Sequence, residues 1–439
     1  MRVLQVLNHF LPHQAAGTEV YTWALSKHLQ QRNIEVKILI PNYGQSSFNQ
    51  YVYDNLEVFQ YAEPSIVDRS LILGLREPEG LSAFCDFLKA EKPDIVHFHE
   101  LAGSNGLGLA HIEAAKKLGA RIIITIHVAK YTCRTGTLMF KDEVMCDGKM
   151  SIEKCTSCYL HMKGDSFVNK AVAMAASFLY KTGLNTTSLK TKTTTALGSY
   201  YQIETWHNTF HKMIDLCDRV VVLTEWYKRM LLLNRVQEEK LALIPQMLPQ
   251  GNKIKYNTLK KSEDPVRLIF IGRISPFKGL HLLMNAIVDF PEDQIKLDIF
   301  GQSTDDEYNN KLKKISAFKK NIAWKGMLDP TLVVDVMRNY DALCLCSTLC
   351  EMSPLVIQEA FAAGITVIAS NVYGNSEQIQ HNHNGLLFKF NSVNSLKKQL
   401  NRLVSEHGLI TKLQQNVKLP ISAENVAADY FALYKTVTA

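Results

Sequence analysis

The sequence lacks several features that would place it in a special structural class. Its 439 residues include only 22 glycines and 13 prolines, and no short repeat is present, which excludes collagen-like and low-complexity chains. The first residues pass from a short apolar run directly into polar sequence, so we expect no secretory signal. No uncharged apolar stretch reaches about 18 residues, and we therefore expect no transmembrane helix.

An excess of charge is also missing. The 49 basic and 42 acidic residues leave a net charge of +7, a mild excess that fits anionic ligands or an anionic membrane surface and does not require nucleic acid. Apolar residues make up 46%, as in ordinary globular proteins of two or three domains. The nine cysteines are odd in number, and five have apolar neighbours, which favours a reduced cytoplasmic chain over a disulfide framework.

Short β-rich runs alternate with helical sequence along the whole chain. This rhythm predicts an α/β fold of parallel sheets with helices on both faces. The predicted strands are residues 2–7, 34–40, 94–98, 121–126, 219–223, 266–271, 296–300, 342–346 and 365–369.

A polar stretch bounded by prolines interrupts this rhythm at residues 249–265. We interpret it as a linker between two Rossmann-like domains, residues 1–248 and 266–420. Two such domains would face each other across a cleft at the carboxyl ends of their strands. The remaining residues, 421–439, are predicted to form a helix that packs back on the first domain.

The predicted strand at residues 266–271 leads directly into a loop with two cations. Gly272 permits a tight exit from the strand, and Arg273 and Lys278 follow in the loop and at the start of the next helix. A helix N-terminus already favours an anion, so two adjacent cations would complete a diphosphate pocket. Taken alone, Arg273 and Lys278 are interpreted equally well as solvated surface charges.

Two glutamates lie eight residues apart at a second strand–loop–helix transition. Glu351 falls in the loop, and Glu359 falls about a turn and a half into a helix whose first turn suits Pro354. A carboxylate can accept hydrogen bonds from two neighbouring hydroxyl groups, which suits the diols of sugars and riboses. Exposed backbone N–H groups between the two glutamates can hold a phosphate or sugar oxygen.

The order and spacing of these residues resemble the retaining GT-B glycosyltransferases of family 4, in particular bacterial surface-polysaccharide members with a cysteine cluster. Gly272-Arg273 with Lys278-Gly279 looks like the family's G-R-x-x-x-x-K-G motif, and Glu351 with Glu359 looks like its E-x7-E motif. Gly374-Asn375-Ser376-Glu377 is similar to its late glycine loop. The resemblance covers most of the chain.

The resemblance implies retaining, metal-independent transfer of a sugar from a nucleotide-sugar to a glycan, with a lipid-linked glycan expected. No cofactor is expected for catalysis. Arg273 and Lys278 would bind the diphosphate and stabilise the leaving group. Glu359 would hold the ribose and Glu351 the transferred sugar. The remaining donor contacts of this half would be Gly272, Ser353, Pro354 and Leu355.

The first domain resembles the acceptor side of the same family. Gly17 belongs to the loop after the first strand, which is similar to the family's glycine-rich loop, although Ala16 stands where a second glycine is common. His127 ends the strand 121–126 and matches a histidine that lies near the transferred sugar. A histidine satisfied within the core is the alternative. His97 and His99 share one face of a strand end, which we expect to point toward the acceptor.

Four cysteines follow His127 closely, and the last two form a C-x-x-C pair. Four thiolates within 26 residues could enclose one tetrahedral zinc ion, with a structural role because no coordination position would stay open. Free thiols or a transient disulfide are the alternatives. The predicted ligands are Cys133, Cys146, Cys155 and Cys158.

Residues 166–203 contain four lysines and no acidic residue before Glu204. Phe167, Ala171, Met174 and Phe178 follow helical spacing. The segment is either an ordinary packed helix and loop or a basic amphipathic element that touches the cytoplasmic face of a membrane.

Other classes of function remain as alternatives. A nucleotide-sugar epimerase would use the same diphosphate pocket without an acceptor. A phosphorylase would need a pyridoxal-binding lysine, and no local sequence pattern indicates one. A dinucleotide-dependent dehydrogenase would carry G-x-G-x-x-G after the first strand, which is missing here. A non-catalytic homologue could retain all four residues of the predicted pocket.

Overall fold

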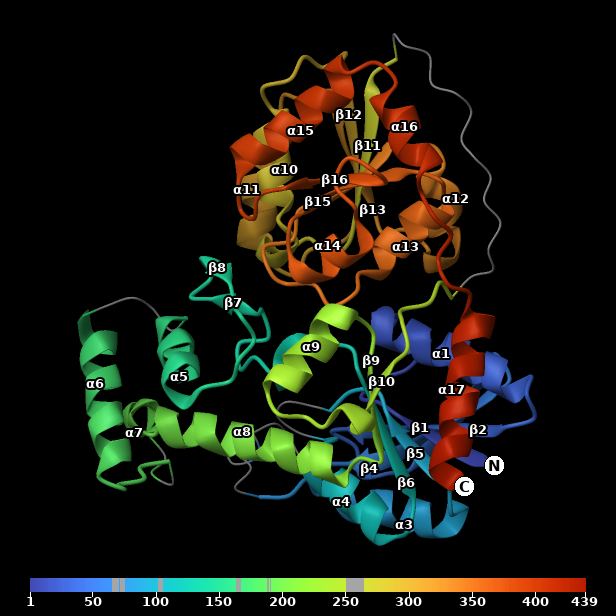
Figure 1. Ribbon diagram of the computed structural model, residues 1–439, viewed down its shortest axis with the longest axis vertical. Coiled ribbons are helices and arrows are strands. Elements are labelled where there is room, and N and C mark those ends of the chain that lie inside the picture. The colour runs from blue at the N-terminus through green and yellow to red at the C-terminus, as the bar shows by residue number, and fades with distance from the viewer. Residues whose placement is uncertain are drawn as a thin grey trace. The chain divides into compact units, whose positions relative to one another are not determined.

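The computed structural model describes residues 1–64, 71, 76–101, 106–162, 167–187, 189, 191–249 and 264–439. The chain divides into two compact units (Figure 1). Unit 1 comprises Met1–Pro245 together with Ala423–Ala439, and unit 2 comprises Gln246–Ser422. The last helix therefore belongs to the first unit. Most of the predicted linker, residues 250–263, lies outside the described residues.

Unit 1 is built on a sheet with the strand order β10-β9-β6-β5-β1-β2-β4-β3. All neighbouring strands are parallel except the edge hairpin β3–β4, which the sequence analysis missed. Its turn residues Asp54 and Asn55 both have positive φ, as a tight two-residue hairpin requires. The strands are β1 Arg2–Val6, β2 Glu35–Tyr43, β3 Asn49–Tyr53, β4 Leu56–Glu63, β5 Ile95–Phe98, β6 Arg121–Ile126, β9 Arg219–Val222 and β10 Leu241–Leu243.

Helices flank this sheet and extend from it as a separate helical group. The last helix, α17, packs against α1, although the two are almost the whole chain apart in sequence (Figure 1). A short hairpin, β7 Met139–Phe140 and β8 Val144–Met145, follows β6. The helices are α1 Gly17–Gln30, α3 Leu81–Glu91, α4 Leu109–Lys117, α5 Ile152–His161, α6 Phe167–Lys181, α7 Lys192–Leu197, α8 Ser199–Leu216, α9 Glu225–Leu233 and α17 Ala423–Thr438.

Unit 2 contains a fully parallel sheet with the order β13-β12-β11-β14-β15-β16. Its strands are β11 Val266–Ile271, β12 Ile295–Phe300, β13 Ile322–Gly326, β14 Ala342–Leu345, β15 Thr366–Ser370 and β16 Gly385–Phe388. Its helices are α10 Leu280–Ile287, α11 Asp306–Ser316, α12 Val333–Met337, α13 Leu355–Ala362, α14 Tyr373–Gln378, α15 Val393–Ser405 and α16 Leu409–Gln415. The predicted α/β class with parallel sheets is confirmed.

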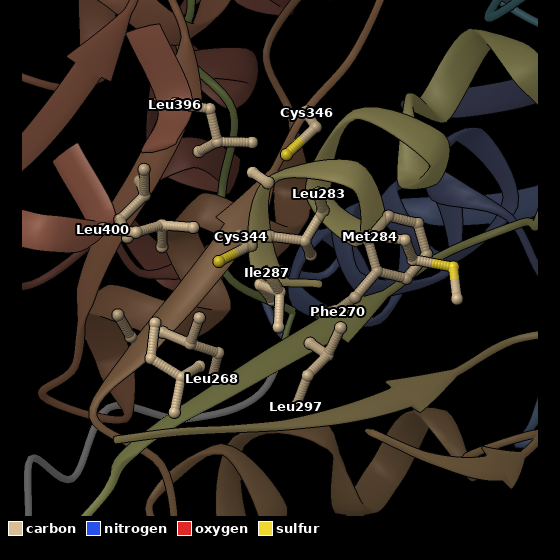
Figure 2. Close-up of a cluster of buried hydrophobic side chains, with 14 of the residues drawn as sticks. Leu268, Phe270, Leu283, Met284, Ile287, Leu297, Cys344, Cys346, Leu396 and Leu400 are labelled. Atoms are coloured by element: carbon tan, nitrogen blue, oxygen red, sulfur yellow. The ribbon is translucent and has the colours of Figure 1, made fainter. Parts of the chain in front are cut away.

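Alternation along the central strands of unit 2 creates two separate cores. Leu268 and Phe270 of β11 pack toward α10 and α15, whereas Ile269 between them faces α12 and α13. Figure 2 shows the first core, with Leu283 of α10 and Leu400 of α15 gathered over the sheet. Because helices cover both faces of the sheet, a ligand can reach it only at the ends of its strands.

No helix within the described ranges combines the length and the hydrophobicity that a bilayer-spanning segment needs.

Candidate functional site

Two strand-end loops of unit 2 lie in backbone contact. β11 and β14 are parallel neighbours, so the loops that follow them leave the same edge of the sheet. Gly279 has φ +65°, and a Cβ atom added there would stand 1.8 Å from the carbonyl oxygen of Cys346. Thr348 donates its N–H to the carbonyl of Phe277 (2.8 Å) and its hydroxyl to that of Pro276 (3.0 Å). The two predicted motifs are therefore joined through main-chain atoms.

This contact brings Lys278 against Glu351. The lysine Nζ lies 2.5 Å from Oε1 of Glu351, and Ser347 donates its hydroxyl to the same oxygen at 2.6 Å. Burial acts to raise the pKa of Glu351, but Lys278 and the hydrogen bond outweigh it, so the pKa is lowered and the carboxylate is ionised. Ser347 was missed in the sequence analysis because nothing in its spacing sets it apart from other strand-end serines.

Arg273 lies in the same loop and is exposed. Its charge contributes to lowering the pKa of Glu351, so the two groups are close enough to interact electrostatically. Within the described parts of the chain its guanidinium makes no hydrogen bond or ion pair. Five N–H donors are thus available for an anion at this edge of the sheet.

Glycines at neighbouring strand ends let the backbones approach closely. Gly272 follows β11 and Gly301 follows β12, and a Cβ atom on Gly301 would lie 2.0 Å from the carbonyl oxygen of Gly272. A Cβ atom added to Gly374 at the start of α14 would likewise lie 2.1 Å from the carbonyl oxygen of Glu351. The sequence analysis missed Gly301, although a glycine directly after a predicted strand was a usable signal.

Glu359 lies on α13, the helix that follows the Glu351 loop. Pro354 is its N-cap and Leu355 its first residue, so the predicted helix start agrees with the structure. Burial raises the pKa of Glu359 to about 7. No described residue forms an ion pair with its carboxyl group. Ser353 and Leu355, also predicted to bind the donor, are partly exposed beside it.

The predicted loop of unit 1 forms the start of α1. Gly17 is the first residue of the helix, and Ala16, its N-cap, is extended with φ −128°, a conformation open to any residue. The N–H of Ala16 donates to the carboxylate of Glu19 at 3.1 Å. The missing second glycine therefore does not disturb the loop. The space beside Gly17 is open.

His127 directly follows β6 and is partly buried. Its ring lies 5.0 Å from that of Tyr21 on α1, and its Nε2 is 3.2 Å from Nδ1 of His99. The expectation that His97 and His99 point toward an acceptor is wrong, because both are completely buried. His97 lies on the central strand β5 and His99 directly follows that strand, beneath α17, which covers that face of the sheet. Burial lowers the pKa of each well below its ordinary value, so these rings are neutral.

The four clustered cysteines line one small cavity of about 20 Å³. Backbone N–H groups point at two of the four sulfur atoms, with Leu138 donating to Cys133 and Lys141 to Cys158, both at 3.3 Å. None of the nine cysteines, all of which lie in the described ranges, forms a disulfide. Among the described residues, no three histidine, cysteine, aspartate or glutamate side chains are already arranged to hold a metal ion. The zinc site stays a prediction.

A larger cavity, of about 630 Å³, lies in unit 1 where several strands of the sheet begin. It is lined by residues that precede β1, β5 and β6, such as Met1, Asp94 and Ala120. Ligands of open α/β sheets bind at the carboxyl ends of the strands, whereas this cavity lies at the amino ends. We therefore assign the candidate site to the strand-end loops.

Two family models match this chain. The model for glycosyl transferases group 1 matches residues 253–419, and the model for glycosyltransferase family 4 matches residues 15–140. An uncharacterized glycosyltransferase of Methanocaldococcus jannaschii is 25% identical over 48% of this chain and 56% of its own length. A lipopolysaccharide 1,2-N-acetylglucosaminetransferase of Salmonella typhimurium is 27% identical over 50% of this chain and 63% of its own. The chain thus spans little more than half the length of these relatives.

Solved structures resemble the whole chain. Sucrose-phosphate synthase of Thermosynechococcus elongatus superposes with a TM-score of 0.65, with 15% identity over 99% of this chain and 98% of its own. HepE of Anabaena, in complex with UDP and glucose, gives a TM-score of 0.60, with 13% identity over 100% of this chain and 99% of its own. At this level of identity the likeness establishes the fold.

We predict that Glu359→Gln makes stability less sensitive to pH. The folded-state pKa of about 7 exceeds the ordinary value of 4.5, so the wild type binds an extra proton when folded and loses stability as pH rises from 4.5 to 7. The neutral amide avoids this loss, and the variant should be more stable at pH 8 by roughly 1–3 kcal/mol. Urea unfolding at pH 4.5 and pH 8 measures the difference. Equal stability differences at both pH values would contradict the prediction.

Proposed function

We propose that this chain, which belongs to the family 4 glycosyltransferases and has their GT-B fold, transfers a sugar with retention from a nucleotide-sugar to a glycan. The observation that carries the proposal is the joining of the two strand-end loops of unit 2, which sets Lys278 against Glu351 with Arg273 close by. Cations and a carboxylate at one sheet edge suit a ligand that has both a diphosphate and sugar hydroxyls.

In this proposal Arg273 and Lys278 bind the diphosphate. The guanidinium of Arg273 is exposed, and the ammonium group of Lys278 can turn from Glu351 toward a phosphate oxygen without leaving the loop. When the bond to the sugar breaks, negative charge develops on the leaving diphosphate. Two fixed cations stabilise that charge, which accelerates the reaction and substitutes for a divalent metal.

Glu351 and Glu359 hold hydroxyl groups of the donor. Glu351 is ionised and already accepts a hydrogen bond from Ser347, so it can accept further bonds from the transferred sugar. Glu359, with Gly272, Ser353, Pro354 and Leu355 as the other donor contacts of unit 2, would hold the ribose. Neither glutamate acts as a nucleophile. The leaving phosphate assists deprotonation of the acceptor on the same face, which retains the anomeric configuration.

His127 and Gly17 are the contributions of unit 1 to the reaction. The imidazole of His127 is neutral because burial lowers its pKa to about 3, so it forms hydrogen bonds to a sugar hydroxyl without bringing a charge. Gly17 leaves open space at the start of α1, where a phosphate-bearing ligand can approach the backbone.

We propose a lipid-linked glycan as the acceptor, in surface-polysaccharide synthesis at the cytoplasmic face of a membrane. A named relative acts on lipopolysaccharide. The described part of α6 supports membrane contact, because Met174 and Phe178 are 68% and 66% exposed, and Lys181 follows them. Its opposite side packs inward through Ala176 and through Tyr180, whose hydroxyl donates to Glu204.

We also propose a structural zinc ion at the four cysteines. Their common cavity and the N–H groups aimed at the sulfur atoms of Cys133 and Cys158 support it, because such donors stabilise thiolate ligands. Lys149 and Lys154 also line the cavity and would offset the negative charge of four thiolates. The side chains must rotate to meet around the ion.

Replacing either donor-site cation should abolish turnover. Arg273→Ala and Lys278→Ala each remove a charge that stabilises the leaving group, and nucleotide release should fall by about 100-fold or more while the protein stays folded. Thermal shifts with UDP-, GDP-, ADP- and dTDP-sugars identify the donor first, since binding stabilises the folded state. Lys313→Ala on the exposed side of α11 is the matched control. Near-normal activity of both variants would reject the assigned pocket.

Membrane contact should depend on the exposed face of α6. Met174→Ser with Phe178→Ser should weaken co-sedimentation with vesicles containing anionic lipid by about tenfold, since two apolar side chains no longer insert. Phe318→Ser is the control, because this side chain is 94% exposed but lies in unit 2. Failure of the wild type to bind vesicles would refute the membrane proposal.

Metal analysis of freshly purified, reduced protein should find about one zinc ion per chain. Cys133→Ser and Cys155→Ser should each lose it, because a site with three thiolates holds zinc less tightly. Cys85→Ser is the control, since Cys85 lies on α3, away from the cavity. Zinc-free wild-type protein, or a disulfide within the cluster, would rule out the metal site.

A further inference from the structure

A row of buried polar side chains runs through unit 1 from His127 to the last helix. Its members come from the central strands and from α17, and every one of them is completely buried. They are Gln5, His97, His99, Thr125, Tyr430 and Tyr434. A polar network in such surroundings is stable only when its donors and acceptors are matched, so its geometry defines where the protons lie.

The row can be followed outward from His127. Nε2 of His127 lies 3.2 Å from Nδ1 of His99, and the other ring nitrogen of His99 lies 2.7 Å from Oε1 of Gln5. The amide nitrogen of Gln5 donates to the hydroxyl of Tyr434 at 3.4 Å. That hydroxyl is 2.7 Å from Nδ1 of His97.

The orientation of the Gln5 amide decides which ring nitrogens carry protons. Because its oxygen faces His99, Nε2 of His99 must be protonated, and its Nδ1 is an acceptor. His127 must then donate from its own Nε2. Since His127 is neutral, its Nδ1 carries no proton. Nδ1 makes no hydrogen bond to any residue that the structure describes, and it is left to accept one from a ligand.

Tyr434 holds the Gln5 amide in this orientation. Its hydroxyl accepts from the amide nitrogen of Gln5 and lies 2.7 Å from Nδ1 of His97, whose Nε2 lies 2.7 Å from the hydroxyl of Thr125. We infer that the proton of the Tyr434 hydroxyl points to Nδ1 of His97, and His97 must then donate from Nε2 to Thr125. If the amide turned over, its oxygen would face the hydroxyl oxygen of Tyr434 with no proton between them, because that hydroxyl proton points to His97. Only a movement of the protons of His97 and Thr125 as well would relieve this conflict. The Tyr434 hydroxyl on the last helix thus determines which atom donates and which accepts in the hydrogen bonds of the row.

We propose that Tyr434 is a positioning residue that acts through Gln5 and His99 to hold His127 in the tautomer with an unprotonated Nδ1, which accepts a hydrogen bond from a sugar hydroxyl. The identity of that ligand rests on the proposed function. The tautomer belongs to the free protein and can be measured without any substrate. The last helix is therefore part of the catalytic apparatus, although Tyr434 itself touches no substrate.

The test compares Tyr434→Phe with Tyr430→Phe. Both variants lose one buried hydroxyl from α17 and keep the ring that packs the core. Tyr430 bonds to Thr125 (2.8 Å) and Tyr21 (3.0 Å), and it is separated from Gln5 by four successive hydrogen bonds of the row. Nitrogen NMR of histidine-labelled protein reports the protonated nitrogen of each ring, and a His127→Asn sample assigns the signals.

We expect unprotonated Nδ1 at His127 in the wild type and in Tyr430→Phe, and a mixture of tautomers in Tyr434→Phe. Nucleotide release from the donor should show kcat lowered by about tenfold in Tyr434→Phe, with KM for the donor changed by less than about twofold. Thermal unfolding checks that both variants fold.

A wild type with protonated Nδ1, or a Tyr434→Phe variant with an unchanged tautomer, would overturn the proposal whatever the activity is. So would equal mixing of tautomers in both variants, because this would indicate general loosening under α17. The expected tautomers in a protein that turns over no donor would support the role of Tyr434 and count against the proposed function instead.

Discussion

The candidate site of unit 2 depends on the close contact between the backbone at Gly279 and the carbonyl of Cys346. Any side chain at Gly279 would separate the loops that follow β11 and β14. With glycine there, one main-chain hydrogen bond and one from the hydroxyl of Thr348 join the two loops, and the side chain of Lys278 reaches that of Glu351 across them. The ion pair is thus a consequence of backbone packing. Because the backbone already holds the two side chains close together, forming the ion pair costs little conformational entropy.

The polar groups at the strand ends are stabilised in different ways in the two units. In unit 2, charged groups compensate one another at the edge of the sheet, where water still reaches Arg273. In unit 1, polar side chains continue into the core, where an unpaired charge would be very unfavourable. Histidine suits this location because its neutral ring offers one donor and one acceptor in a fixed direction. The row between His127 and Tyr434 stays uncharged, and each of its hydrogen bonds has a defined donor and a defined acceptor.

The sequence allowed nine of the strands and the two strand-end loops of unit 2 to be predicted, because both depend on local patterns. Val266 to Ile271 is an apolar run between polar breaks, and the distance from Glu351 to Glu359 is fixed by one loop and one helical turn. The burial of His97 and His99 could not be predicted in this way. It depends on α17, which lies more than 300 residues later in the chain, and no local period reports such a contact. Ser347 was missed for a similar reason, since its role appears only when the loops meet.

In the proposed function, the Lys278–Glu351 pair would also couple the binding of two parts of a donor, its diphosphate and its sugar. In the structure each charge satisfies the other, and Glu351 is too buried to remain without a donor. If Lys278 turns toward a diphosphate, the carboxylate loses its strongest partner and needs another hydrogen-bond donor. Under the proposed function, sugar hydroxyls on the same molecule would provide it. A diphosphate without its sugar would leave Glu351 poorly satisfied, so the pair would favour the intact nucleotide-sugar over the nucleotide that remains after transfer. The same ion pair would thereby assist the release of product.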